Sequence, residues 1–99
     1  MNTSVVDIQD NRALNVQCTD DSLIVDLNDG RTMTIPLAWY PRLQHATREE
    51  RKDWKLIGEG IGIHWNVIDE DISIEGLILG RASGESQESF NKWLQARKK

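Results

Sequence analysis

The chain has almost no cysteine, few histidines and no long hydrophobic run. Its single cysteine, Cys18, excludes an internal disulfide, and no apolar stretch approaches the roughly 18 residues of a membrane-spanning helix. The N-terminal residues carry neither the basic segment nor the apolar segment of a signal peptide. These absences predict a protein of the reducing cytoplasm that does not enter a membrane.

An excess of positive charge is also missing. The 99 residues carry a formal net charge of −4, and the hydrophobic content of 38% is typical of a soluble globular domain with a modest core. Because phosphate neutralisation needs a net basic face, nucleic acid is expected to be bound only weakly or through a partner. One local basic stretch, between Arg42 and Lys55, is the exception to the acidic balance.

What the sequence does have is the alternation of apolar and polar residues that is typical of half-buried strands. It runs through residues 14–18, 23–27 and 32–35, and again through 61–65 and 72–75. In the first of these strands, Leu14, Val16 and Cys18 are expected on one face. The apolar run 77–79 fits either a strand or a turn of helix.

Two helices are predicted from capping signals and periodicity. Thr47 and Glu50 have the spacing of a capping box, which predicts a helix from about Arg48 to Trp54. A second helix is predicted over about 86–97, because Phe90, Trp93 and Leu94 would share one face.

The resulting fold prediction is an α+β domain over residues 13–99. It has a small antiparallel sheet of about five strands, with one mid-chain helix and a C-terminal helix. Along the chain, three strands are followed by a helix, two strands and a helix. Residues 1–12 are polar and aperiodic, and are predicted to form a flexible arm or a short leading strand.

The link between the second and third strands allows a more detailed prediction. A two-residue loop would mix apolar and polar residues on one face, whereas a three-residue loop of Asn28, Asp29 and Gly30 sets Val25 opposite Met33. Since register follows the buried face, we expect a type I turn closed by a bulge, with Gly30 in the left-handed region.

Acid–base chemistry has one candidate, His64, which precedes Asp69, Glu70 and Asp71 by a few residues. A histidine near carboxylates can act as a general base. No nucleophile elbow or oxyanion-hole motif accompanies it, so a structural histidine bonded to a carboxylate or carbonyl is favoured. No catalytic residue is assigned.

No metal or cofactor is predicted either. The spacings of His45, His64 and Cys18 match no zinc motif, and three consecutive acids in a strand point alternately to opposite faces. The glycine run from Gly58 to Gly62 is not followed by the lysine that a phosphate-binding loop needs. A hairpin turn is therefore the favoured interpretation.

Contact with a partner is the remaining role for the aromatic and charged side chains that these motifs contain. Trp39, beside Tyr40 and before the basic stretch, is the best candidate for an exposed aromatic anchor, although core packing is favoured for it. The full set of candidate partner-binding residues is Trp39, Tyr40, Arg42, Arg51, Lys52, His64, Asp69, Glu70 and Asp71.

Several separated motifs resemble a small bacterial family of unknown function, DUF2442. They are Asp29-Gly30-Arg31, Pro41-Arg42-Leu43, Ala46-Thr47-x-Glu49-Glu50-Arg51-x-x-Trp54, Gly60-Ile61-Gly62-Ile63-His64-Trp65 and Asp69-Glu70-Asp71-Ile72-Ser73-Ile74-Glu75-Gly76-Leu77. They occur in the family's order over about 16–80. Members commonly have proline after the His-Trp pair, where this chain has Asn66.

The resemblance implies a small α+β fold and names no catalytic residue. Some relatives carry a helix-turn-helix domain after this one, and none is expected here. Genes of the family often lie beside a gene for a second small protein, in what look like toxin–antitoxin pairs. This implies an antitoxin-like role.

Three functions follow from these observations. The leading hypothesis is a non-enzymatic binding protein, antitoxin-like, whose partner is a small protein encoded by the adjacent gene; a homodimer is a second option. The first alternative is a DNA-binding regulator or co-repressor acting through the basic stretch and the tail at residues 97–99. The second is a small hydrolase centred on His64.

Overall fold

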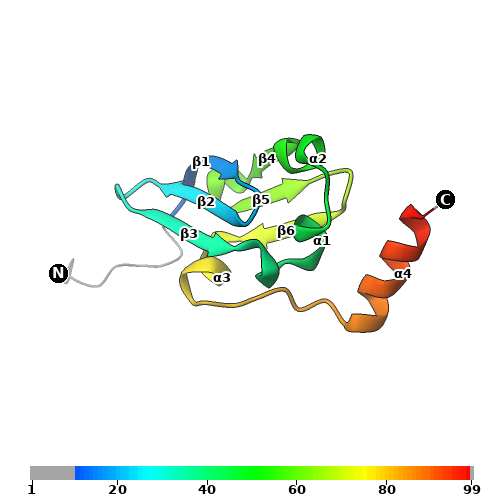
Figure 1. Ribbon diagram of the computed structural model, residues 1–99. Helices are drawn as coiled ribbons and strands as arrows, with labels where there is room; N and C mark the ends of the chain where they lie inside the picture. The colour runs from blue at the N-terminus through cyan, green and yellow to red at the C-terminus, as the bar shows by residue number, and fades with distance from the viewer. Residues whose placement is uncertain (1–10, 99) are drawn as a thin grey trace.

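The computed structural model describes residues 11–98, and within them two antiparallel sheets of three strands each lie against one another (Figure 1). The first sheet has the order β1-β2-β3 and the second has the order β4-β5-β6. The strands are β1 (Ala13–Cys18), β2 (Ser22–Leu27), β3 (Thr32–Pro36), β4 (Trp54–Ile57), β5 (Gly62–Trp65) and β6 (Glu70–Ser73). The arm predicted over 1–12 lies almost wholly outside the described residues.

Short helices connect the strands, and one longer helix follows them. The single turns are η2 (Leu37–Trp39) and η3 (Gly58–Gly60), and the α-helices are α1 (Pro41–Gln44), α2 (Arg48–Lys52), α3 (Ile74–Ile78) and α4 (Gln87–Arg97). The α+β class is therefore confirmed. The expected strand number was approximate, because the described chain has six strands in two sheets.

The additional strand is β4, where the sequence predicted the end of a helix. Helix α2 begins with the predicted Thr47–Glu50 capping box but ends at Lys52. The next residues pair across strands instead: Trp54 lies opposite Trp65 and Leu56 opposite Ile63. Cross-strand packing of these large side chains outweighs local helix propensity.

Two smaller corrections concern β1 and the end of the second sheet. A bulge between Ala13 and Asn15 shifts the register, so Ala13 faces the core and Leu14 is 64% exposed. The predicted strand over 72–75 ends at Ser73, whose hydroxyl accepts a hydrogen bond from the amide of Gly76 at 2.9 Å. This cap starts α3, so the run 77–79 is the end of a helix rather than a strand.

The predicted hairpin register is confirmed. Val25 lies opposite Met33 and Leu23 opposite Ile35, and Gly30 has a φ of 94°. The amide of Gly30 donates to the carbonyl of Leu27 at 3.1 Å, and the amide of Leu27 donates to the carbonyl of Arg31 at 2.8 Å. These two bonds close a type I turn with a bulge around a three-residue loop.

Replacing Gly30 with valine should therefore destabilise the protein by about 1–2 kcal/mol, because a β-branched residue is strained at a positive φ. No heavy atom outside the adjacent residues lies within 4 Å of the Cβ position, so the loss is expected to come mainly from the backbone conformation. Gly30→Asn is the matched control, since asparagine tolerates this region. Equal thermal melting temperatures for the valine variant and the wild type would contradict the turn assignment.

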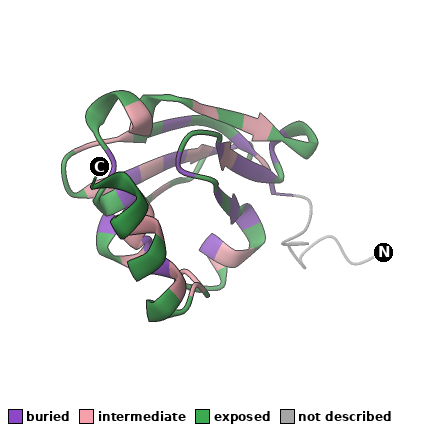
Figure 2. Cartoon of the chain, turned by 90° about the vertical axis from the view of Figure 1, so that its right-hand side faces the viewer, coloured by how far each residue is buried: buried purple, intermediate pink, exposed green. Residues whose placement is uncertain are grey.

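One core joins the two sheets. The inward side chains of β2 are fully or almost fully buried and belong to the same cluster as Ile63 and Trp65 of β5 (Figure 2). The indole of Trp65 donates a hydrogen bond to the carbonyl of Arg51 at 3.0 Å, which fixes α2 above the second sheet.

Helix α4 begins after its N-cap, Ser86, and contacts α1, α2 and the residues that join them. Phe90 is buried against the ring of His45, with 5.2 Å between ring centroids. Near the end of the helix, Arg97 forms an ion pair with Glu50 at 2.8 Å. The apolar face predicted from periodicity is therefore the face that contacts the body of the domain.

Candidate binding pocket beside strand β6

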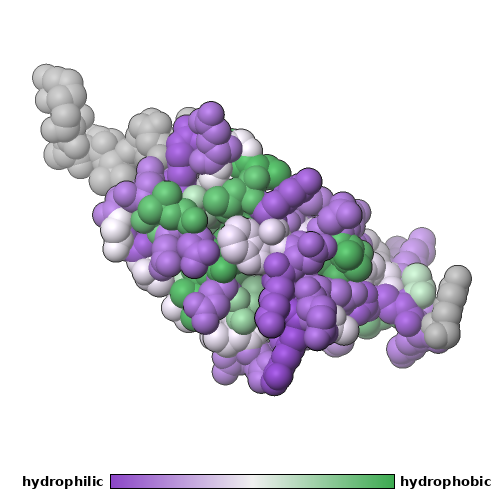
Figure 3. Space-filling view, turned by 90° about the horizontal axis from the view of Figure 1, so that it is seen from above, coloured by the Kyte–Doolittle hydropathy of each residue, from purple (hydrophilic) through white to green (hydrophobic). Residues whose placement is uncertain are grey.

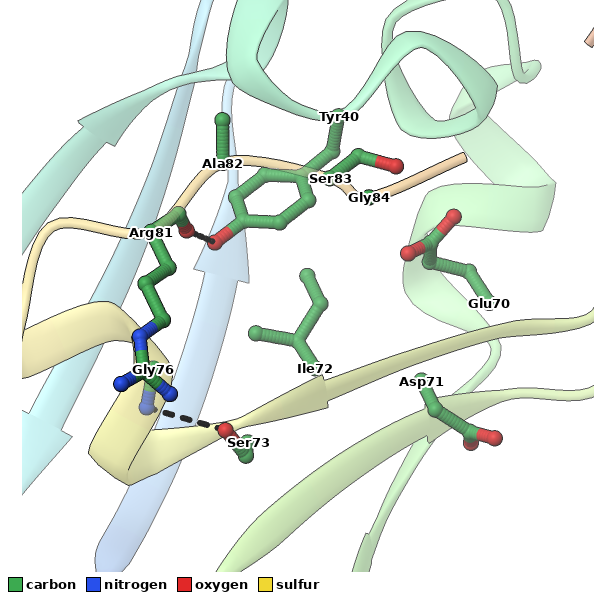
Figure 4. A pocket seen from close by; sticks show the side chains of 10 residues that line it. All are labelled: Tyr40, Glu70, Asp71, Ile72, Ser73, Gly76, Arg81, Ala82, Ser83 and Gly84. Atoms are coloured by element: carbon green, nitrogen blue, oxygen red, sulfur yellow. Dashed lines mark hydrogen bonds between the residues drawn. The ribbon is translucent and has the colours of Figure 1, made fainter. Parts of the chain in front are cut away.

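A recess of about 220 Å³ lies between edge strand β6 and the segment 81–84 (Figure 4). Its walls come from β6, the start of α3, Tyr40 and that segment. The lining residues are Tyr40, Glu70, Asp71, Ile72, Ser73, Gly76, Arg81, Ala82, Ser83 and Gly84.

The loop before β6 determines which acid of Asp69, Glu70 and Asp71 faces this recess. Ile68 is fully buried and anchors the loop, and Asp69 has a φ of 54°. The strand then alternates, so Glu70 and Ile72 point toward the segment 81–84 while Asp71 points away (Figure 4).

Glu70 is only 9% exposed, yet its carboxylate has no hydrogen bond or ion pair with any residue among 11–98. Burial raises the pKa of Glu70 to about 7, and the nearby acids Glu85, Asp71 and Asp69 act in the same direction. The charge of Arg42 opposes this shift without cancelling it. The recess therefore contains a buried acid that lacks a direct partner.

Arg42 is close to this acid but is already bound elsewhere. Its Nε donates to the carboxylate of Glu85 at 3.0 Å, and a terminal nitrogen donates to the carbonyl of Ile68 at 2.9 Å. The hydrogen bond from Arg42 is also the main cause that lowers the pKa of Glu85. Its guanidinium lies 5.3 Å from the ring centroid of Trp93. Arg42 thus ties the β5–β6 loop to the segment before α4.

The hydroxyl groups that line the recess also form hydrogen bonds within the protein. Tyr40 is 4% exposed and donates to the carbonyl of Arg81 at 3.0 Å. Burial and the charge of Glu70 raise the pKa of Tyr40 to about 12. Ser73 accepts from the amide of Gly76, and Ser83 accepts from the amide of Glu85 at 3.2 Å. These groups shape the recess through hydrogen bonds to the backbone.

His64 lies on the opposite face of the second sheet. It pairs with Asp71 across β5 and β6, and its Nδ1 contacts the Asp71 carboxylate. On its other side it lies opposite Lys55 of β4. The favoured interpretation, a structural histidine bonded to a carboxylate, agrees with this geometry. His64 does not line the recess that contains Glu70.

Two arginines of the basic stretch, Arg42 and Arg51, hold the structure together. The side chain of Arg51 is 11% exposed and donates to the carbonyls of Leu43 and Gln44 at 2.9 Å and 2.7 Å. Arg48 forms an ion pair with Asp20 at 3.1 Å. Lys52 is exposed. The stretch therefore presents less free positive charge than its sequence suggests.

Trp39 is half-buried rather than fully exposed. Its side chain packs against the core, and its carbonyl accepts from the amide of Ser83 at 2.9 Å. Ser83 and Glu85 were not predicted as site residues, because no local pattern reveals that they contact Trp39 and Arg42. Those contacts join residues more than forty positions apart in the sequence.

Among residues 11–98, no three His, Cys, Asp or Glu side chains are grouped so that they could hold a metal ion. No helix there is both long and apolar enough to cross a membrane.

The family model described as protein of unknown function (DUF2442) matches residues 13–83. The chain belongs to this family. The match ends before α4, so the DUF2442 region contains both sheets and all the recess residues except Gly84, whereas α4 lies beyond it.

Two solved structures are similar to this DUF2442 protein. A crystal structure of a protein of unknown function from Rhodospirillum rubrum has a TM-score of 0.67 and 28% identity, covering 79% of this chain and 96% of that one. A solution structure of an uncharacterised protein from Chromobacterium violaceum has a TM-score of 0.63 and 21% identity, covering 88% and 76%. The comparison with curated proteins finds no match.

Proposed function

We propose that this DUF2442 protein is a binding module, antitoxin-like, that acts by contact with a small protein partner encoded by the adjacent gene. The observation that carries the proposal is Glu70, which is 9% exposed and whose carboxylate has no partner within residues 11–98, in an open recess where the hydroxyl groups form hydrogen bonds with the backbone. Such a site is suited to recognition of a charged group. The family resemblance is the reason to expect that this charged group belongs to a protein partner.

The distribution of surface side chains is compatible with contact with a protein, although it does not mark one face. Large apolar side chains reach the surface in several places, and Figure 3 shows them interspersed with polar ones on the upper face. They include Leu14, Ile57, Ile61, Val67 and Leu79. A mixed surface of this kind is typical of non-obligate protein interfaces.

The other two functions have less support. DNA binding through the basic stretch would lack Arg42 and Arg51, whose side chains are 15% and 11% exposed and hold the β5–β6 loop and the end of α1. It would be left with Arg48, Lys52 and Lys55 on a chain with a net charge of −4. Hydrolysis centred on His64 would need a recess around it, whereas His64 lies on a sheet face beside Lys55 and Asp71. Partner binding is therefore preferred.

The test is co-expression with the product of the neighbouring gene. We expect one complex on size-exclusion chromatography, and relief of any growth defect that the neighbour causes alone. A basic partner would suit a chain with a net charge of −4, so complex formation should weaken as salt is raised. Separate elution at low salt, together with an unchanged growth defect, would end the proposal.

A further inference from the structure

We propose that the Glu70 recess binds the side chain of a lysine or arginine presented by the partner protein, with the cationic end against Glu70 and the methylene stem along the recess. This inference rests on the proposed function, since it takes the ligand from a protein partner.

The need for a cation follows from the surroundings of Glu70. Its carboxylate is aimed into the recess, has no hydrogen bond within residues 11–98, and lies near three further acids. The cation in its vicinity, Arg42, donates instead to Glu85 and to the carbonyl of Ile68. An incoming ammonium or guanidinium group would form charge-assisted hydrogen bonds with a carboxylate that has no partner within residues 11–98.

The shape of the recess selects a cation on an aliphatic stem. Ile72 and the ring of Tyr40 line the way to Glu70, so methylene groups can pack there while the charged end reaches the acid (Figure 4). One wall is made of small residues, Ala82, Ser83 and Gly84, which leave room for the stem. A compact ion such as ammonium would leave these apolar surfaces uncovered.

Charges on the other side of the recess set the direction of entry. Arg81 lines the end near α3, with Tyr40 and Ile72 between its guanidinium and Glu70 (Figure 4). Because Arg81 repels a second cation, the charged group of the ligand is directed toward Glu70.

Capped pentapeptides with one central lysine, arginine or norleucine between glycines are suitable probes for NMR titration. With the lysine and arginine peptides at up to about 20 mM, we expect shifts of the amide signals of Gly76, Ala82, Ser83 and Gly84. The norleucine peptide has a similar stem without charge and should bind at least about tenfold more weakly. Equal binding of the norleucine peptide, or no shift with the cationic peptides, would overturn the inference.

Variants locate the interaction. Glu70→Gln should weaken binding of the lysine peptide at least about tenfold, because it removes the charge and keeps the shape. Glu75→Gln is the matched control: it removes the same charge from an exposed position in α3 and should change binding less than about twofold. Unchanged binding by Glu70→Gln would overturn the inference.

Butylammonium distinguishes the source of the cation. If it binds more tightly than the lysine peptide, the site belongs to free amines and the partner assignment is wrong. The co-expression experiment separates the two proposals. A complex that tolerates Glu70→Gln contradicts the pocket inference alone, whereas peptide binding without any complex contradicts only the proposed function.

Discussion

Replacing Glu70 with glutamine is expected to stabilise the protein at pH 8 by roughly 3 kcal/mol. The wild-type carboxylate is buried without a direct partner, and its pKa is raised from 4.5 to about 7. Ionising this carboxyl group at pH 8 therefore costs more free energy in the folded protein than in the unfolded chain. Glutamine has a similar shape and no charge to bury.

The effect should depend on pH in a defined way. Below about pH 4.5 the carboxyl group is protonated in both states, so the variant and the wild type should be similarly stable. Between about pH 4.5 and 7 only the unfolded chain loses the proton, so the wild type loses stability relative to the variant as pH rises. Above pH 7 the difference in the free energy of unfolding between the variant and the wild type approaches its full value.

Urea denaturation of both proteins at pH 4.5, 6 and 8 measures this difference directly. Glu50, whose pKa is lowered by hydrogen bonds from Arg97, is present in both proteins and cancels in the comparison. The control Glu75→Gln should show little change at any of these pH values. A difference between Glu70→Gln and the wild type that is constant with pH would mean that Glu70 does not titrate in this range.

Gly60→Ala is expected to destabilise the protein by about 2–4 kcal/mol. Gly60 has a φ of 100°, and a Cβ at this position would lie 2.6 Å from the carbonyl oxygen of Ala13 and 3.2 Å from its amide nitrogen. These are backbone atoms of β1, so the clash cannot be relieved by turning a side chain. The first sheet and the turn before β5 would have to separate.

Two other glycines serve as controls for this prediction. Gly80 also has a positive φ, 77°, but its missing side chain faces open space, so Gly80→Ala isolates the backbone penalty at about 1 kcal/mol. Gly84 has open space and no positive φ, and Gly84→Ala should change stability by less than about 0.5 kcal/mol. If Gly60→Ala melts at the same temperature as Gly80→Ala, the close approach of residue 60 to Ala13 does not contribute to the loss of stability.

Features that neighbouring residues specify could be predicted from the sequence. The three-residue loop ending at Gly30 follows from the requirement that one face of the hairpin stays apolar, and the Thr47–Glu50 cap follows from a fixed spacing. Strand β4 was missed because its four residues follow a strong helix start, and only their pairing with β5 reveals the strand. The bulge at Leu14 was missed for the same reason.

The candidate site was predictable only in part. Strand alternation implies that Glu70 and Asp71 point to opposite faces, but it does not say which of them is buried; the pairing of β6 with β5 decides that. Arg42 was predicted as a surface contact, whereas it binds Glu85, a residue with no distinguishing local pattern. Contacts over such separations depend on tertiary packing.

The topology of the two sheets has a consequence for how the chain folds. Each sheet is built from three consecutive strands, so each can form by closing short loops, with little entropy lost before contacts are made. Neither sheet can bury its inner face without the other, because Val25 and Trp65 belong to the same cluster. Docking of two locally formed halves would then limit the folding rate, and Gly60, where β1 meets the turn before β5, lies at that junction.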